Sequence, residues 1–164
     1  MQTAFIIIDV QNILVETGFE TQKLLEKISY LQDQARKQQI EIIYIQHIET
    51  EEALTSEDWK LSPLLKRQSD EKVFQKRYNS MFKETGLKEY LDQQGIEKLV
   101  LCGMQTEYCV DTSVKVAFEH GYKLVVPEGT VTTFDGDDIP AETINDFYEN
   151  IWDERFADVL DYKT

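Results

Sequence analysis

The chain contains few of the residues on which several classes of protein depend. Its 164 residues include two cysteines, three prolines and two histidines. Two cysteines offer no disulfide framework, so a hydrophobic core must hold the fold together, and this length is enough for one domain. No apolar run approaches a membrane span, and residues 1–9 lack the charged start of a secretory signal. We therefore expect a single domain, residues 1–164, that is cytoplasmic and has no membrane partner.

Positive charge is also scarce. Lysine and arginine number 17 against 31 aspartates and glutamates, which gives a formal net charge of −14. Proteins that bind nucleic acid need clustered lysine and arginine against the phosphates, so we expect no nucleic-acid partner. An acidic membrane surface is disfavoured for the same reason. The acidic residues are scattered along the chain, as is typical of a solvated surface.

Strand and helix patterns alternate along the chain. Short apolar runs predict strands at 4–9, 40–45, 71–75, 99–102, 124–126 and 157–160. Helical spacing of apolar residues predicts helices at about 20–38, 86–94, 108–120 and 141–153, and the stretch 47–70 has no regular pattern. Such alternation is typical of an α/β fold, a doubly wound parallel sheet of six strands between two helix layers.

Cys109 lies where a buried strand gives way to a helix. The strand ends near Cys102, and from Val110 the apolar residues Val114 and Ala117 follow at helical spacing. A thiol in the first turn of a helix meets free backbone N–H groups and the positive end of the helix dipole, and both favour thiolate. The same N–H groups are suited to an oxyanion. The alternative is an ordinary buried cysteine.

Two other strands end in a charged residue, and three motifs follow strand ends. Asp9 opens D-V-Q-N after the first strand, Lys76 opens K-R-Y-N-S-M-F after the third, and Gly103 opens G-M-Q-T-E-Y-C-V-D-T after the fourth. Each motif alone is a weak signal. In combination they resemble the isochorismatase-like cysteine hydrolases, a superfamily that includes nicotinamidases and carbamoylsarcosine amidase. The resemblance extends from Ala4 to about Leu160.

The resemblance implies a strand order of 3-2-1-4-5-6. In that order the first and fourth strands are neighbours at the point where the winding direction changes, and ligands bind outside the carboxyl ends of the strands there. Asp9 and Cys109 would face each other across this crevice. Lys76 ends a strand two positions away, a gap of about 10 Å that a lysine side chain and a curled strand end can span.

The resemblance also implies a mechanism. Cys109 attacks the carbonyl carbon of a small amide-like substrate, Asp9 takes the thiol proton and passes it to the leaving amine, and Lys76 stabilises the charged forms. Water activated by Asp9 then hydrolyses the thioester. The enzyme would be a hydrolase of non-peptide carbon–nitrogen bonds that needs no cofactor.

Further site residues follow from the same motifs. The resemblance implies a cis peptide between Met104 and Gln105 and an oxyanion hole made by the backbone N–H groups of Gln105 and Cys109. Thr106 would brace this loop by hydrogen bonding, or cap the following helix. Four side chains near the motifs are candidates for substrate binding, and each is alternatively a core or structural residue: Gln11, Trp59, Phe82 and Tyr108.

Three alternatives stay open. Nicotinamidases bind a metal after the second strand, but His47 has no second histidine near it, so we expect no metal site and treat an atypical nicotinamidase as an alternative. A catalytically silent binding domain is the second alternative. In the third, a thiol-redox module, Cys102 would resolve an oxidised Cys109 from within a buried strand, where it is poorly placed.

The stretch 47–70 also bears on assembly. It carries Leu54, Trp59, Leu61, Leu64 and Leu65 in chain without regular pattern, and such residues need burial. We expect a homo-oligomer, at least a dimer, with Trp59 shielded near the mouth of the site. The alternative is that this segment folds onto its own subunit.

Overall fold

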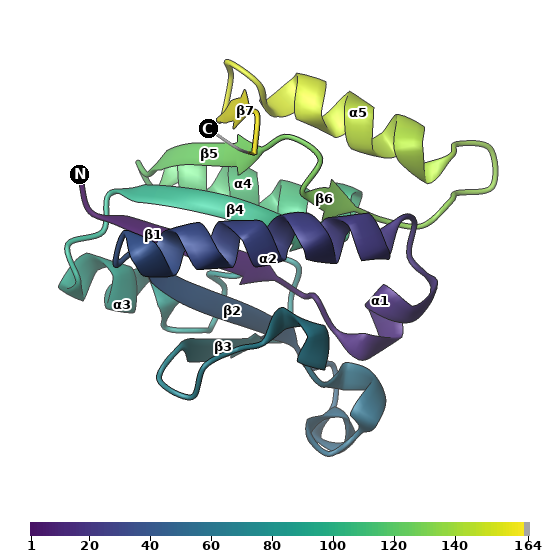
Figure 1. Ribbon diagram of the computed structural model, residues 1–164, viewed down its shortest axis with the longest axis horizontal. Helices are drawn as coiled ribbons and strands as arrows, with labels where there is room; N and C mark the ends of the chain where they lie inside the picture. The colour runs from purple at the N-terminus through teal and green to yellow at the C-terminus, as the bar shows by residue number, and fades with distance from the viewer. Residues whose placement is uncertain (163–164) are drawn as a thin grey trace.

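The computed structural model describes residues 1–162 and contains one parallel sheet with helices on both faces (Figure 1). The strands are β1 (Thr3–Ile8), β2 (Glu41–His47), β3 (Lys72–Lys76), β4 (Lys98–Met104), β5 (Lys123–Pro127), β6 (Val131–Thr132) and β7 (Asp158–Leu160). The α-helices are α1 (Asn12–Thr17), α2 (Thr21–Lys37), α3 (Leu87–Gln93), α4 (Asp111–Glu119) and α5 (Ala141–Trp152).

The strand order confirms the doubly wound α/β fold. The sheet runs β3-β2-β1-β4-β5-β7, and the two-residue strand β6 pairs with β4. All six strand pairs are parallel. The sixth strand of the expected order is therefore β7, because β6 is too short to be recognised from a sequence pattern. The winding direction changes between β1 and β4, so the crevice between their carboxyl ends is the expected place for a site.

The strands are buried on both faces, and alternate residues serve two different cores. From β1, Ala4, Ile6 and Ile8 face the layer that holds α3, α4 and α5, whereas Phe5 and Ile7 face the layer of α2. This alternation follows from the two-residue period of a strand. It explains why β1 has no polar residue between Ala4 and Ile8.

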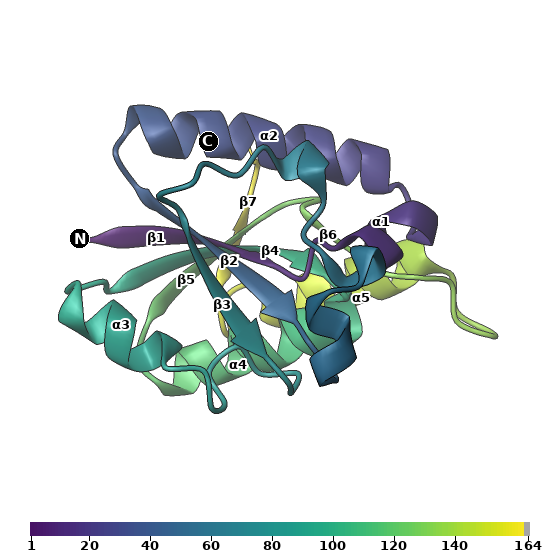
Figure 2. The ribbon, with the colours of Figure 1, turned by 90° about the horizontal axis from the view of Figure 1, so that it is seen from below.

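Helix α2 covers one face of the sheet, and α3 and α4 cover the other (Figures 1 and 2). Leu24, Ile28 and Ala35 of α2 are buried against the sheet, and they recur at helical spacing. With 17 residues, α2 is the longest helix in the part of the chain that the structure describes. Across residues 1–162, no helix is both long and apolar enough to cross a membrane.

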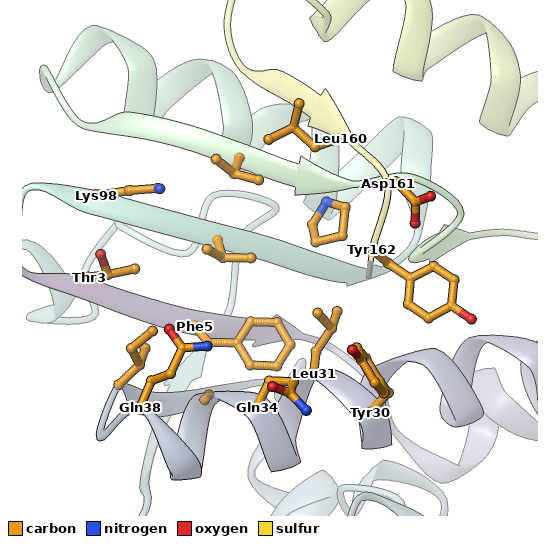
Figure 3. Close-up of a pocket in the computed structure, with 15 residues that line it drawn as sticks. Thr3, Phe5, Tyr30, Leu31, Gln34, Gln38, Lys98, Leu160, Asp161 and Tyr162 are labelled. Atoms are coloured by element: carbon orange, nitrogen blue, oxygen red, sulfur yellow. The ribbon is translucent and has the colours of Figure 1, made fainter. Parts of the chain in front are cut away.

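A pocket of about 320 Å³ lies beside α2, on the face of the sheet that α2 covers (Figure 3). Phe5 and Leu31 form part of its apolar wall, and Thr3 and Lys98 lie at the amino ends of their strands. Asp9, Lys76 and Cys109 are not among the residues that line it. The candidate chemistry therefore lies elsewhere, at the carboxyl edge of the sheet.

Two segments differ from their sequence prediction. The helix expected at 108–120 begins instead as a π-helical turn, Thr106–Val110, and continues as α4 from Asp111. The irregular stretch after β2 folds into three short 3-10 turns, at Glu51–Leu54, Glu57–Trp59 and Pro63–Leu65. Apolar spacing marks which residues are buried, but it does not distinguish a π turn from the first turn of an α-helix.

Candidate active site

Asp9, Lys76 and Cys109 meet at the carboxyl edge of the sheet. Asp9 follows β1 directly, Lys76 is the last residue of β3, and Cys109 lies in the π turn after β4. The Lys76 Nζ is 2.9 Å from Asp9 Oδ2 and 3.1 Å from Cys109 Sγ. The lysine and aspartate side chains are 0% and 1% exposed. The structure therefore brings together three residues that are far apart in the sequence.

The backbone at this edge is unusual at two positions. Asp9 has φ of 52°, in the left-handed region that Asp and Asn adopt more readily than most residues. Gly103 of β4 has φ of 127°, and a Cβ added there would lie 2.0 Å from the carbonyl oxygen of Ile8. Glycine thus allows β4 to approach β1 closely at the point where Asp9 leaves its strand.

The ammonium of Lys76 lies among four acceptors. Besides Asp9 Oδ2 and Cys109 Sγ, its Nζ is 3.0 Å from His47 Nδ1 and 2.9 Å from the carbonyl oxygen of Tyr78. His47 and Lys76 are partners in the register of β2 and β3, so both side chains leave the same face of the sheet at the same level. This cage is what satisfies a fully buried charge.

The same side chains need to be tested as a metal site. Asp9, His47 and Cys109 offer ligand atoms that all lie within 4.8 Å of one another. Zinc binds such atoms at about 2.0–2.3 Å in a tetrahedral arrangement. Lys76 Nζ lies between 2.9 and 3.1 Å from an atom of each of the three, so its ammonium occupies the point where they would meet around a cation. The set therefore fits an ammonium ion, and we assign no metal to it.

Burial raises the pKa values of Asp9 and Cys109, the candidate base and the candidate nucleophile. It raises the pKa of the Asp9 carboxyl although Lys76 pulls the other way. Burial and the neighbouring charge of Asp9 raise the pKa of the Cys109 thiol to about 12. The thiolate expected at the start of a helix is thus wrong for the resting site, because burial and the adjacent Asp9 both disfavour a charged sulfur.

The sulfur of Cys109 is consequently a thiol in the resting site, beside the ion pair of Asp9 and Lys76. Asp9 Oδ1 is buried and has no hydrogen-bond partner within residues 1–162, so one carboxylate oxygen is open to accept a proton. A carboxylate with a raised pKa is a stronger base than an ordinary one. The arrangement is suited to moving the thiol proton during attack.

The loop before Cys109 is held by a set of hydrogen bonds. The Met104–Gln105 peptide is cis, and the carbonyl oxygen of Gln105 accepts from the N–H groups of Tyr108 and Val110 at 3.1 and 3.2 Å. Thr106 Oγ1 donates to Asn145 Oδ1 of α5 at 2.6 Å, so Thr106 braces this loop through its side chain. These contacts fix the backbone that carries the N–H groups of Gln105 and Cys109.

Gln11 does not offer its side chain to a substrate. It is fully buried, and its Nε2 donates to the carbonyl oxygens of His47 and Trp59 at 2.9 and 2.6 Å. Its Oε1 accepts from the N–H of His47 at 2.9 Å. The sequence-based assignment of Gln11 to substrate binding is therefore corrected: its amide holds the segment after β2 against the end of β1.

Phe82 also has a different place from the one expected. Its ring lies 4.9 Å from that of His120 and 6.0 Å from that of Tyr122, beyond the carboxyl end of α4. Its ring therefore packs at the carboxyl end of α4, whereas Cys109 lies before the amino end of that helix. Proximity in sequence to a catalytic motif did not predict proximity in space.

The other two aromatic candidates lie near the cluster. Tyr108 precedes Cys109 and is 54% exposed. Trp59 is half-buried, with its ring 5.9 Å from the ring of His47. The carbonyl oxygen of Trp59 accepts from Gln11 Nε2, which holds this part of the segment after β2 against the end of β1.

Two polar residues of the site were missed by sequence reasoning. The sequence suggests His47 only as a metal ligand, whereas the structure places it against Lys76. Asn79 Oδ1 is 3.9 Å from Cys109 Sγ. Both line an open cavity of about 510 Å³ together with Thr112 and Tyr78. The only sequence signal for either was its closeness to a strand end or to the motif that starts at Lys76.

The fold and the site together define an α/β protein with a cysteine, an aspartate and a lysine in contact where the winding direction of the sheet changes. The family model described as "Isochorismatase domain" matches residues 3–162. The chain belongs to the isochorismatase family. A solved structure titled as an isochorismatase family protein superposes with a TM-score of 0.92 at 30% identity, covering 97% of this chain and 98% of that one.

Curated relatives agree with this assignment. An uncharacterised isochorismatase family protein of Bacillus subtilis, YddQ, is 29% identical over 159 residues, 88% of each chain. Streptothricin hydrolase of Streptomyces noursei is 28% identical over 144 residues, which is 84% of this chain and 51% of the relative. Maleamate amidohydrolase of Pseudomonas putida is 37% identical over 59 residues, 36% of this chain and 28% of the relative. Family members are hydrolases, amidohydrolases among them.

Proposed function

We propose that this protein hydrolyses a carbon–nitrogen bond of a small amide-like substrate through a thioester on Cys109. The observation that carries the proposal is the buried contact of Lys76 Nζ with both Asp9 Oδ2 and Cys109 Sγ. A base, a cation and a nucleophile within hydrogen-bond reach of one another are the elements of covalent acyl transfer. The amidohydrolase among the relatives supports this choice of bond.

The first half of the reaction forms the acyl-enzyme. Cys109 Sγ bonds to the carbonyl carbon while its proton passes to Asp9, and the carbonyl oxygen becomes an oxyanion. The N–H groups of Gln105 and Cys109 are the proposed donors to that oxyanion. Asp9 then gives the proton to the nitrogen, the carbon–nitrogen bond breaks, and the amine or ammonia leaves.

The second half restores the enzyme. Asp9 takes a proton from water, whose oxygen attacks the thioester carbon, and the carbon–sulfur bond breaks. The sulfur leaves as a thiolate beside Lys76 and recovers its proton from Asp9. The ammonium is 3.1 Å from the sulfur, so it stabilises the transient negative charge on that atom.

A screen of small amides for ammonia release tests the proposal. We expect release from at least one primary amide with the wild-type protein and none above background with Cys109→Ala. Cys102→Ala is the matched control, since Cys102 lies in β4 with its side chain in the core, and it should keep the activity. Release that persists in Cys109→Ala would overturn the proposal.

A further inference from the structure

Lys76 has more acceptors than it has protons to donate. A lysine ammonium carries three N–H donors. Four acceptor atoms lie within 3.1 Å of Lys76 Nζ: Asp9 Oδ2, His47 Nδ1, the carbonyl oxygen of Tyr78 and Cys109 Sγ. The acceptors therefore compete, and the neutral thiol is the weakest of the four. Its contact with Lys76 strengthens only when the sulfur becomes negative.

His47 takes part in this competition as a neutral imidazole. Its Nδ1 faces an ammonium, so that nitrogen accepts and the ring proton is on Nε2, which lies 3.4 Å from Glu49 Oε1. Burial and the charge of Lys76 lower the pKa of His47, while Asp9 and Glu49 act in the opposite direction. Cys109 also lies near the ring, since its Sγ, a ring nitrogen of His47 and a carboxylate oxygen of Asp9 all lie within 4.8 Å of one another.

The position of His47 is fixed from several sides. Gln11 bonds to both the N–H and the carbonyl oxygen of His47, each at 2.9 Å. The register pair with Lys76 sets its height on the sheet, and the ring of Trp59 lies beside it. The buried amide of Gln11 thus fixes the backbone of His47, and from that position its Nδ1 lies 3.0 Å from Lys76 Nζ.

We propose that His47 is a positioning residue of the hydrolytic site, whose Nδ1 holds the Lys76 ammonium centred between Asp9 and Cys109. Before attack, His47 Nδ1, Asp9 and the Tyr78 carbonyl occupy the three N–H groups. When the sulfur becomes negative, one N–H of the ammonium turns to it. Either His47 Nδ1 or the Tyr78 carbonyl oxygen then loses its hydrogen bond to Lys76. The ammonium group only rotates about its bond to the side chain, and the rest of the Lys76 side chain stays in place. This inference rests on the proposed function.

The first test needs no substrate. The chain has two histidines, His47 and His120, so a nitrogen-15 NMR spectrum of the imidazoles contains two ring systems, assigned with a His120→Gln variant. We expect His47 at neutral pH to be the neutral tautomer with its proton on Nε2. In Lys76→Met this preference should weaken, because Nδ1 loses its donor. A ring protonated on Nδ1 in the wild type would overturn the proposal.

The second test uses two His47 variants and the amide found in the screen. His47→Asn places an amide oxygen where Nδ1 was, whereas His47→Phe keeps a ring without an acceptor. We expect His47→Phe to lower kcat about 10- to 100-fold with KM changed less than twofold, the usual effect of a displaced catalytic group. His47→Asn should recover most of kcat. Wild-type kcat in His47→Phe, or equal losses in both folded variants, would overturn it.

The two proposals fail in distinguishable ways. If the wild-type protein releases no ammonia from any amide, the proposed function fails, and the NMR tautomer still decides whether His47 accepts from Lys76. If hydrolysis depends on Cys109 but not on an acceptor at position 47, the hydrolase stands and the role of His47 falls. Should His47→Phe not fold, the tautomer and its response to Lys76→Met decide the question.

Discussion

Single residues at this site behave differently from the same residues in water. Burial and the charge of Asp9 raise the pKa of the Cys109 thiol, and burial also raises the pKa of the Asp9 carboxyl. The positive group in contact with the sulfur is the ammonium of Lys76, whose side chain has no contact with solvent. In the function we propose, Cys109 is therefore activated by proton transfer during the reaction and not by a thiolate already present in the resting site.

Alkylation of Cys109 tests its protonation state. Because the pKa of the thiol is raised, its thiolate fraction should increase about tenfold per pH unit from pH 7 to 10. We expect the rate of modification by iodoacetamide, followed by mass spectrometry, to rise accordingly, and Cys102 to stay unmodified because it is fully buried. Free cysteine, whose pKa is about 8.5, is the control and should level off within this range. A rate for Cys109 that is already constant near pH 7 would show a depressed pKa instead.

Replacing Asp9 by Asn tests the base. Asn keeps the size of the side chain and tolerates the left-handed backbone at this position, so the fold should be retained. The variant loses the proton acceptor and the counter-charge to Lys76, and we expect the acylation rate to fall at least ~100-fold. Stopped-flow measurement gives the acylation rate, and a circular dichroism melt shows whether the fold is retained. Near-normal turnover in a folded variant would mean that the carboxylate is structural.

At the scale of elements, the close approach of β1 and β4 is what sets Asp9 and Cys109 face to face. Gly103 allows this approach, because a Cβ there would lie 2.0 Å from the carbonyl oxygen of Ile8. We expect Gly103→Ala to lower the free energy of unfolding by about 3 kcal/mol or more, through backbone strain and overlap. Gly95→Ala is the control. It also has positive φ but nothing within 4 Å, and should cost about 1–2 kcal/mol. Equal losses in urea unfolding would contradict this account.

The strands show which parts of the fold the sequence predicts and which it does not. Strands such as β1 were predicted to within about a residue, because a run such as Phe5–Ile8 can only be buried. The meeting of Asp9 and Cys109 needed the strand order, which came from the family resemblance and which the sheet confirms. The pairing of His47 with Lys76 depends on the register of β2 and β3, and no local pattern encodes that register.

Side-chain roles were harder to predict than side-chain neighbourhoods. Gln11 was expected at the substrate, and it does lie at the edge of the site, but its amide is fully used by the backbone of His47 and Trp59. Phe82 follows the motif of Lys76 in sequence and packs beyond α4. Both errors have the same physical cause: a residue's direction is set by tertiary contacts that the motif does not contain.

At the scale of the whole molecule, exposed apolar residues are the basis of a prediction about assembly. Leu54 and Leu64, both in the segment after β2, are 42% and 58% exposed, and Tyr108 beside Cys109 is 54% exposed. We expect a homo-oligomer, at least a dimer, that covers part of this surface. Sedimentation at micromolar concentration should give a mass above the 19.2 kDa of one chain. A monomer would mean that these side chains remain in solvent.

The central claim is that Cys109 carries the acyl group during hydrolysis. The most direct measurement is intact-protein mass spectrometry of the enzyme quenched in acid during turnover of its amide, followed by peptide mapping. The account predicts a mass increase equal to the acyl part of the substrate, located on the peptide that contains Cys109 and absent from Cys109→Ala. An acyl group on another residue, or hydrolysis by the Cys109→Ala variant at the wild-type rate, would contradict it.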